Sequence, residues 1–213
     1  NTQILSFSFS IISGTILLLI SLIDSVNVLA QDKIMTLSGK YLDVNITDDS
    51  GANVFFDVQK KNGKTRKISL HKGELFSVQK DGKEESVLYA QDLDFGYDLS
   101  EEDIRHLIYG QHDAREGYNA NPSMIGGFAV GFGSSLYLGS GLVPLTIPFA
   151  YSLAMQIPYI KIKQKTISDQ AYTLNDYYKE GYNKTARSKK MIRSFLGCAT
   201  GVVLGMGISE LTQ

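Results

Sequence analysis

The strongest constraint in this sequence is a long stretch, residues 117–160, that contains no charged side chain. All four prolines lie within it, at Pro122, Pro144, Pro148 and Pro158. A helix of a water-soluble domain normally carries charged or polar residues on its solvent face. The stretch therefore favours insertion into a membrane, and the alternative is a tightly packed helical hairpin buried inside a soluble domain.

Small residues recur at every fourth position in this stretch and again near the C-terminus. On an α-helix this spacing places them on one nearly straight stripe, where missing side chains let two backbones approach closely. We therefore predict that the two stripes pack against each other. The predicted interface consists of Ser123, Gly127, Gly131, Ser135 and Gly139 on one side, and Gly197, Gly201, Gly205 and Ser209 on the other.

Charge is unevenly distributed along the chain. Residues 31–117 contain 12 basic and 17 acidic residues, whereas residues 161–193 contain 9 basic and 3 acidic residues. A basic block between two apolar segments is typical of membrane-flanking sequence, and nucleic-acid binding is the weaker interpretation. The predicted membrane-flanking residues are Lys161, Lys163, Lys165, Lys189, Lys190 and Arg193. Since residues 194–209 are short for a full span, we expect Lys189, Lys190 and Arg193 to extend toward the headgroups.

Topology is predicted conditionally. In an inner membrane, the positive-inside tendency would place the basic block in the cytoplasm. With the N-terminal part of the chain in the periplasm, residues 123–160 would then cross an odd number of times.

Residues 1–30 have the form of a signal peptide, with a nearly continuous apolar run over residues 11–23. Val28, Leu29 and Ala30 provide a cleavage site before Gln31. An uncleaved transmembrane anchor is the alternative. The single cysteine, Cys198, excludes an internal disulfide and a cysteine-ligated zinc site.

From residue 31 to residue 97 the apolar pattern has a period of two, as in half-buried antiparallel strands. Turn sequences such as Asn62-Gly63 and Asp81-Gly82 separate the runs. We predict a small all-β module, a five- or six-stranded SH3-like barrel or meander, which serves as an interaction module or spacer.

Helices are predicted beyond this module, which makes the fold class α+β. Ser100 begins an amphipathic helix over residues 98–118, because Ser100 and Asp103 have capping-box spacing. An uncharged, Gly- and Pro-containing helical region follows over residues 119–160, with a helix at 124–142 and a shorter one at 145–160. A basic polar helical segment over residues 161–193 then continues without a breaker into an apolar helix at 194–213.

A faint internal repeat is also visible. Residues 116–119 have the same sequence as residues 180–183, and Gly127 is separated from Gly197 by 70 positions. The two separations differ, so an inexact duplication and coincidence explain them equally well.

Catalytic chemistry is not indicated. His106 and His112 are six positions apart, which disfavours a metal pair on one helix face. His112 and Asp113 are adjacent, so on a helix their side chains point about 100° apart and do not form an acid–base pair. No phosphate loop, nucleophile elbow or cofactor fingerprint is present. We predict a protein that is not an enzyme, with no metal, no cofactor and no nucleic-acid partner.

Several short motifs resemble a known group of sequences. Asp32-Lys33-Ile34, Ser38-Gly39-Lys40 and Lys80-Asp81-Gly82-Lys83 are similar to the N-terminal β-module of uncharacterised exported proteins of Bacteroidota. The later order also resembles that group: residues 110–114, a Gly-rich segment, residues 178–182, then Ala186-Arg187 and Lys189-Lys190 before a second Gly-rich segment. The paired stripes are similar to the glycine-zipper domains of bacterial envelope proteins. These resemblances imply an exported, membrane-associated protein and assign no activity.

The leading functional hypothesis is a non-enzymatic protein of the bacterial cell envelope, a scaffold or partner-docking module anchored in the lipid bilayer. Its β-module would be periplasmic and would bind a protein partner, or the chain would form homo-oligomers. Two alternatives remain open: an oligomeric membrane-active, channel-like protein, and a soluble exported ligand-binding protein.

Overall fold

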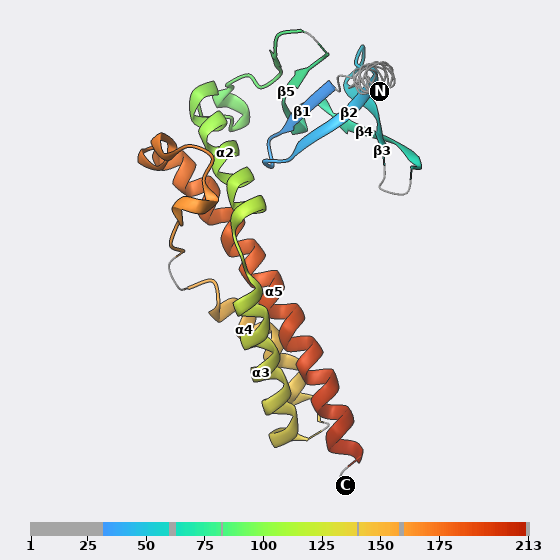
Figure 1. Ribbon diagram of the computed structural model, residues 1–213, viewed down its shortest axis with the longest axis vertical. Coiled ribbons are helices and arrows are strands. Elements are labelled where there is room, and N and C mark those ends of the chain that lie inside the picture. The colour runs from blue at the N-terminus through green and yellow to red at the C-terminus, as the bar shows by residue number, and fades with distance from the viewer. Residues whose placement is uncertain (1–31, 60–62, 82, 140, 158–159, 212–213) are drawn as a thin grey trace, which may run out of the picture. The chain divides into compact units, whose positions relative to one another are not determined.

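A computed structural model describes residues 32–59, 63–81, 83–139, 141–157 and 160–211. The predicted signal peptide and its cleavage site lie outside the described residues. The described chain has the predicted α+β class: an antiparallel sheet comes first and helices follow it (Figure 1).

The sheet has six strands in the order β4-β3-β2-β1-β5-β6. Neighbouring strands are antiparallel throughout, and β1 lies between β2 and β5. The strands are β1 (Asp32–Thr36), β2 (Tyr41–Asp48), β3 (Asn53–Gln59), β4 (Thr65–His71), β5 (Leu75–Gln79) and β6 (Ser86–Val87), with short 3-10 helices at η1 (Lys72–Glu74) and η2 (Leu93–Phe95).

Alternation along the strands builds the core of the sheet, as the sequence predicts. The buried residues of this core are Ile34, Val44, Val54, Phe56, Leu75 and Val78. The barrel prediction is not confirmed, because β4 and β6 both end the strand order and the described sheet is open. One edge, β6, is only two residues long.

The β1–β2 turn connects the sheet with the first described helix, α2 (Glu101–Gly117). Gly39 has a φ of 75°, and a Cβ at this position would lie 2.5 Å from Cβ of Gln111. Arg115 donates a hydrogen bond of 2.8 Å to the carbonyl oxygen of Ser38. Glycine at position 39 therefore serves both a left-handed turn and a close approach to α2.

Ser100 caps α2, since its hydroxyl accepts a hydrogen bond of 3.2 Å from the amide of Asp103. The next helix, α3 (Asn121–Leu138), has Pro122 in its first turn and ends at Gly139, whose φ is 74°. The predicted end at residue 142 was therefore too late. After η3 (Val143–Thr146) comes α4 (Ile147–Ala154), much shorter than the predicted segment over residues 145–160.

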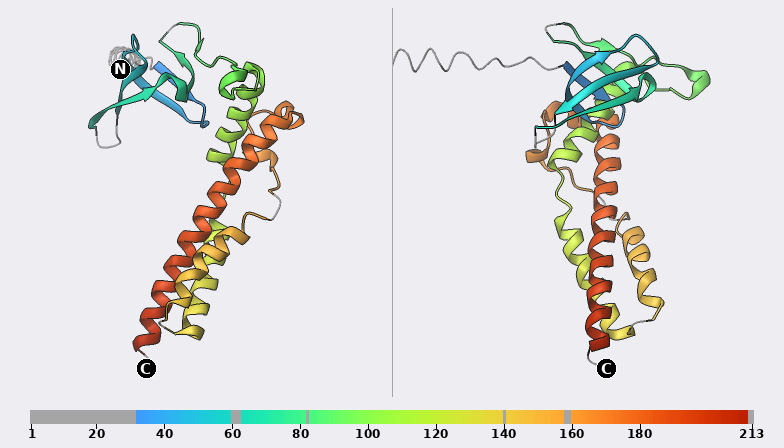
Figure 2. Two further views of the ribbon diagram at one scale, coloured as in Figure 1. Left: turned by 180° about the vertical axis from the view of Figure 1, so that it is seen from behind. Right: turned by 90° about the vertical axis from the view of Figure 1, so that its right-hand side faces the viewer.

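The last helix, α5 (Asp176–Leu211), has 36 residues and is the element that the other helices contact. Its first half packs against α2, and its second half packs against both α3 and α4 (Figures 1 and 2). The predicted continuity between the basic helical segment and the apolar helix at 194–213 is present, because α5 passes through residue 193 without a break. Helicity does not extend through residues 161–175, which are irregular except for η4 (Gln164–Thr166) and η5 (Gln170–Leu174).

Candidate functional site

The α3–α5 contact brings together backbones rather than large side chains. A Cβ added to Gly127 would overlap the carbonyl oxygen of Ser194, and one added to Gly131 would overlap that of Cys198. On α5, a Cβ on Gly201 would lie 2.7 Å from the amide nitrogen of Phe132. These distances leave no room for a side chain, so each position requires glycine.

The contacts across this interface are reciprocal. Gly127 faces Ser194 while Gly197 faces Met124; Gly131 faces Cys198 while Gly201 faces Phe128. Each partner is 70 positions further along the chain than its counterpart, since 194 − 124, 197 − 127, 198 − 128 and 201 − 131 all equal 70. Such reciprocity is the pattern of two parallel helices related by a local two-fold axis.

The α2–α5 contact repeats the pattern with a separation of 71. Gly110 faces Tyr178, whereas Gly181 faces Leu107 (178 − 107 = 181 − 110 = 71). Sequence reasoning did not identify these two glycines as interface positions. The separation of 70 positions between Gly127 and Gly197 could have indicated them, because it is nearly the same as the separation of 71 between facing residues of α2 and α5. The identical tetrapeptides at 116–119 and 180–183, 64 apart, do not occupy equivalent positions.

Most of the predicted stripe residues are buried where α3 and α5 meet. They are Ser123, Gly127, Gly131 and Ser135 on α3, and Gly197, Gly201, Gly205 and Ser209 on α5. Gly139 is the exception: nothing lies within 4 Å of a Cβ added there. Its positive φ ends the helix, so it does not join the interface.

Hydroxyl groups inside the bundle bond mainly to their own helices. Ser135 donates to the carbonyl oxygen of Gly131 at 3.0 Å, and Ser152 donates to that of Phe149 at 2.9 Å. Within the described residues, the buried hydroxyl of Ser194 has no hydrogen-bond partner. The buried residues of α3 and of the second half of α5 are therefore mostly small or hydroxylated, with Val202 as a larger apolar residue among them.

Large apolar side chains are exposed on α3, η3, α4 and the second half of α5, and on the segments that connect them. Tyr137 is 89% exposed, Ile125 is 70% exposed and Val203 is 67% exposed. The other exposed apolar residues of this region are Phe128, Val130, Leu136, Leu138, Leu142, Val143, Leu145, Phe149, Leu153, Ile157, Ile192, Leu196, Leu204, Ile208 and Leu211. Among the described helices, α5 has the length and hydropathy needed to cross a membrane.

The predicted flanking cations have different environments. Lys161, Lys163 and Lys165 are exposed. Lys189 is not extended toward solvent: its Nζ donates to the carbonyl oxygens of Arg115 at 2.7 Å and Tyr118 at 2.8 Å. A third, longer bond reaches Ala114. Burial lowers the pKa of Lys189.

Lys190 is buried, with 8% of its surface exposed. The predicted extension toward headgroups is therefore not seen for Lys189 and Lys190. Arg193 remains exposed, with one guanidinium nitrogen 3.9 Å from the sulfur of Met124.

A buried carboxylate connects α2, α5 and the segment between α4 and α5. Asp113 accepts hydrogen bonds from the amide of Ser168 at 2.8 Å and from the hydroxyl of Tyr178 at 2.6 Å. The Ser168 hydroxyl is a third donor to this carboxylate. Burial is the larger cause of the raised pKa of Tyr178, and the bond to Asp113 is the next.

His112 does not join this network. Its ring packs edge-on against Tyr41, with 4.3 Å between centroids, and its buried Nδ1 has no partner among the described residues. The adjacent side chains thus diverge, as expected for successive helical residues. No cluster of three or more metal-ligating side chains occurs within the described part of the chain.

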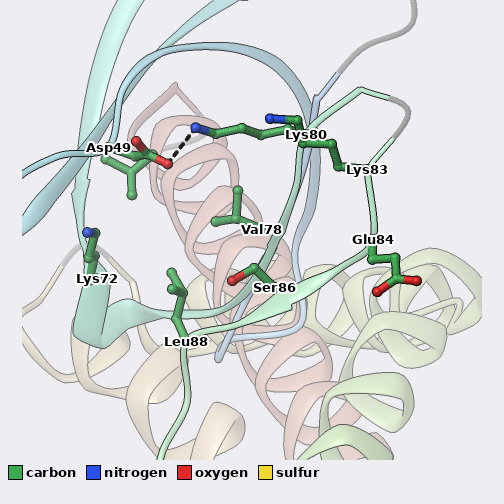
Figure 3. A pocket seen from close by; sticks show the side chains of 9 residues that line it. Asp49, Lys72, Val78, Lys80, Lys83, Glu84, Ser86 and Leu88 are labelled. Carbon is green, nitrogen blue, oxygen red and sulfur yellow. Dashed lines mark ion pairs between the residues drawn. The ribbon is translucent and has the colours of Figure 1, made fainter.

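Described residues of the β-module line a smaller and a larger cleft. The smaller, of about 250 Å³, has an apolar floor that includes Val54, Val78 and Leu88. Figure 3 shows Lys80 extending to Asp49, with which it forms a 2.7 Å ion pair. Lys72 and Lys83 lie at its rim (Figure 3). Because acidic groups neutralise part of this rim, we expect the smaller cleft not to select ligands by their charge.

The larger cleft, of about 560 Å³, is lined by residues of the β1–β2 turn, β2, β3, β4 and η1. Its apolar lining comes from Leu42, Phe56, Val58, Ile68 and Leu70, and Lys40 and Glu74 lie among its polar residues.

Comparison with models of protein families, with curated proteins and with solved structures gave no match to this chain.

Proposed function

We propose that this chain is a non-enzymatic, membrane-anchored docking protein of the cell envelope. In this proposal α3, α4 and the second half of α5 lie in the bilayer, and the β-module presents a binding surface outside it.

One observation carries the proposal: the helical bundle places small and hydroxylated residues inside and large apolar residues outside. Such a surface is unfavourable in water, and soluble monomers rarely expose contiguous apolar patches larger than a few hundred Å². Lipid tails satisfy apolar side chains, so helices in lipid associate through close packing of small residues. The absence of charge from residues 117–160 and 194–209 supports the same placement.

Alkaline carbonate extraction of native membranes tests the anchor. The protein is expected to remain in the membrane pellet. A sharper test replaces an outward leucine: Leu204, which is half exposed, becomes lysine in Leu204→Lys. In lipid this change costs about 2.5–3.5 kcal/mol near the centre of a span and should release part of the protein.

The matched control is Lys184→Leu, which changes an exposed position in the first half of α5, outside the apolar region. It should leave extraction unchanged. Release of the unmodified protein by carbonate, with Leu204→Lys behaving as a harmless surface change, would favour the soluble alternative and contradict the anchor.

A further inference from the structure

The strand β4 ends the sheet on one side. In the described chain it pairs with β3 alone, in a register that runs from Thr65 opposite Gln59 to His71 opposite Asn53. The outer side of an antiparallel edge strand leaves the amide and carbonyl groups of alternate residues without a partner. With seven residues, β4 is long enough to pair with another strand over several bonds.

Side chains of β4 also line the larger cleft. Ile68 and Leu70 contribute to its wall next to Phe56 and Val58 of β3. Ile68 and Leu70 are only partly buried, so the apolar interior of the sheet is open beside this edge. An added strand would place every second side chain on this face, where the cleft can receive apolar groups.

The charge of β4 and the described residues beside it is positive. Residues 63–72 contain four basic residues, Lys64, Arg66, Lys67 and Lys72, and no acidic residue, while Asp57 on β3 lies opposite Lys67. Arg66 and Lys67 on β4 itself are exposed. The rest of the module, residues 31–62 and 73–97, contains 6 basic and 11 acidic residues, so this basic edge differs from it in charge.

From these three observations we infer that the free edge of β4 binds an extended acidic segment of a partner protein as an additional strand. Main-chain hydrogen bonds supply affinity, and alternate apolar side chains enter the cleft. The basic residues select acidic segments and repel basic ones. The inference rests on the proposed docking role and names its partner class, but it does not depend on membrane insertion.

A designed peptide tests this binding on the full-length protein in neutral detergent. The probe is a fluorescein-labelled heptapeptide of alternating glutamate and valine, and binding is measured by fluorescence anisotropy. We expect it to bind, and its lysine–valine counterpart to bind at least about tenfold more weakly. N-methylation of alternate amides should weaken binding to a similar degree, because it removes the main-chain donors on one side of the peptide.

Two charge-reversed variants give the matched comparison. The double variant Arg66→Glu/Lys67→Glu should weaken binding at least about tenfold and reduce its salt dependence. Lys33→Glu alters an exposed lysine on the central strand β1 and should bind as the unmodified protein does. Circular dichroism of each variant shows whether it remains folded.

Three outcomes would overturn the inference: no binding by the folded protein, equal binding of the N-methylated peptide, or equal binding of the two charge types. A fourth concerns lipid. Displacement of the peptide by dihexanoyl phosphatidylglycerol as effectively as by unlabelled peptide would assign the basic edge to anionic headgroups instead.

Carbonate extraction of the same variants separates this inference from the proposed anchor. The charge-reversed variant should remain in the membrane pellet while losing the peptide. Peptide binding by a protein that carbonate releases would contradict the anchor and leave the edge-strand site standing.

Discussion

At the scale of single residues, glycine positions decide how closely the helices pack. Gly201 and Gly207 lie on the same helix, but a Cβ on Gly207 has nothing within 4 Å, whereas one on Gly201 meets the backbone of α3. Both should gain helix propensity when replaced, by up to about 1 kcal/mol. A difference between them therefore reports packing.

We predict that Gly201→Leu destabilises the protein by about 1–3 kcal/mol, because the backbones of α3 and α5 must move apart. Gly207→Leu should be neutral or slightly stabilising. Thermal unfolding in detergent, followed by circular dichroism, measures both. Equal melting of the two variants would show that close approach at Gly201 contributes nothing to stability.

Tyr178 gives a prediction for alkaline pH. Its raised pKa means that the folded state holds the phenol proton more tightly than the unfolded chain does. The resulting stability is fully present below the ordinary tyrosine pKa of about 10 and is lost as pH rises toward and through the folded-state pKa. The melting temperature should therefore fall above pH 10.

In Tyr178→Phe the alkaline loss should be smaller. Stability at pH 7 should also drop by about 1–3 kcal/mol, because the buried Asp113 loses one of its donors. The control is Tyr137→Phe, since Tyr137 is 89% exposed. Its melting temperature should fall above pH 10 by as much as that of the unmodified protein. An unchanged pH profile in Tyr178→Phe would contradict the role given to Tyr178.

At the scale of elements, Lys189 stabilises the end of α2. Its ammonium group bonds to the carbonyl oxygens of Ala114, Arg115 and Tyr118 at the junction between α2 and α3, where the last carbonyl groups of a helix lack helical donors. We predict that Lys189→Met costs about 1–3 kcal/mol and increases amide hydrogen exchange around residues 114–120. Lys184→Met changes an exposed lysine on the same helix and should leave exchange there unchanged. Equal exchange in the two variants would rule out this capping role.

Local pattern was sufficient to predict several elements and insufficient for others. The strands follow from alternation, the start of α2 from the Ser100 cap, and the continuous α5 from the lack of a breaker. The end of α3 was misplaced because Gly139 adopts a left-handed conformation that composition alone does not reveal. The choice between a barrel and an open meander could not be made from the sequence, since the same alternation suits an open or a closed sheet.

The candidate sites show a similar division. Spacing predicts which small residues share a face of α3 or α5. It does not predict that Asp113 bonds to Tyr178, 65 positions away, or that Lys189 reaches α2. These contacts depend on how the helices align along one another, and that alignment is a tertiary property.

At the scale of the whole described chain, α3 and α4 run in opposite directions beside the second half of α5 (Figure 2). The basic segment after α4 returns to α2, where Ser168 bonds to Asp113 and Thr166 bonds to Tyr182. If these helices lie in a bilayer as proposed, residues 123–160 would cross it an even number of times, in contrast to the odd number expected from the positive-inside tendency. In a bilayer, the basic segment and the β-module would lie on the same side.

Cysteine labelling tests this topology in a Cys198→Ser background. Single cysteines at Gly51, between β2 and β3, and at Lys184, in the first half of α5, should react alike with an impermeant thiol reagent in whole cells. A cysteine at Gly141, between α3 and η3, should respond in the opposite way. Opposite labelling of Gly51→Cys and Lys184→Cys would restore the odd-crossing arrangement.

The separation of about 70 positions between facing residues also has a consequence for synthesis. Ribosomes build the chain from its N-terminus, so α3 and α4 are complete before their common partner α5 exists. Until residues 194–205 of α5 have been made, the glycine face of α3 lacks the neighbours that it contacts in the structure. The bundle can therefore close only after the second half of α5 has been made, and a chain truncated before α5 would leave that face of α3 open to other helices.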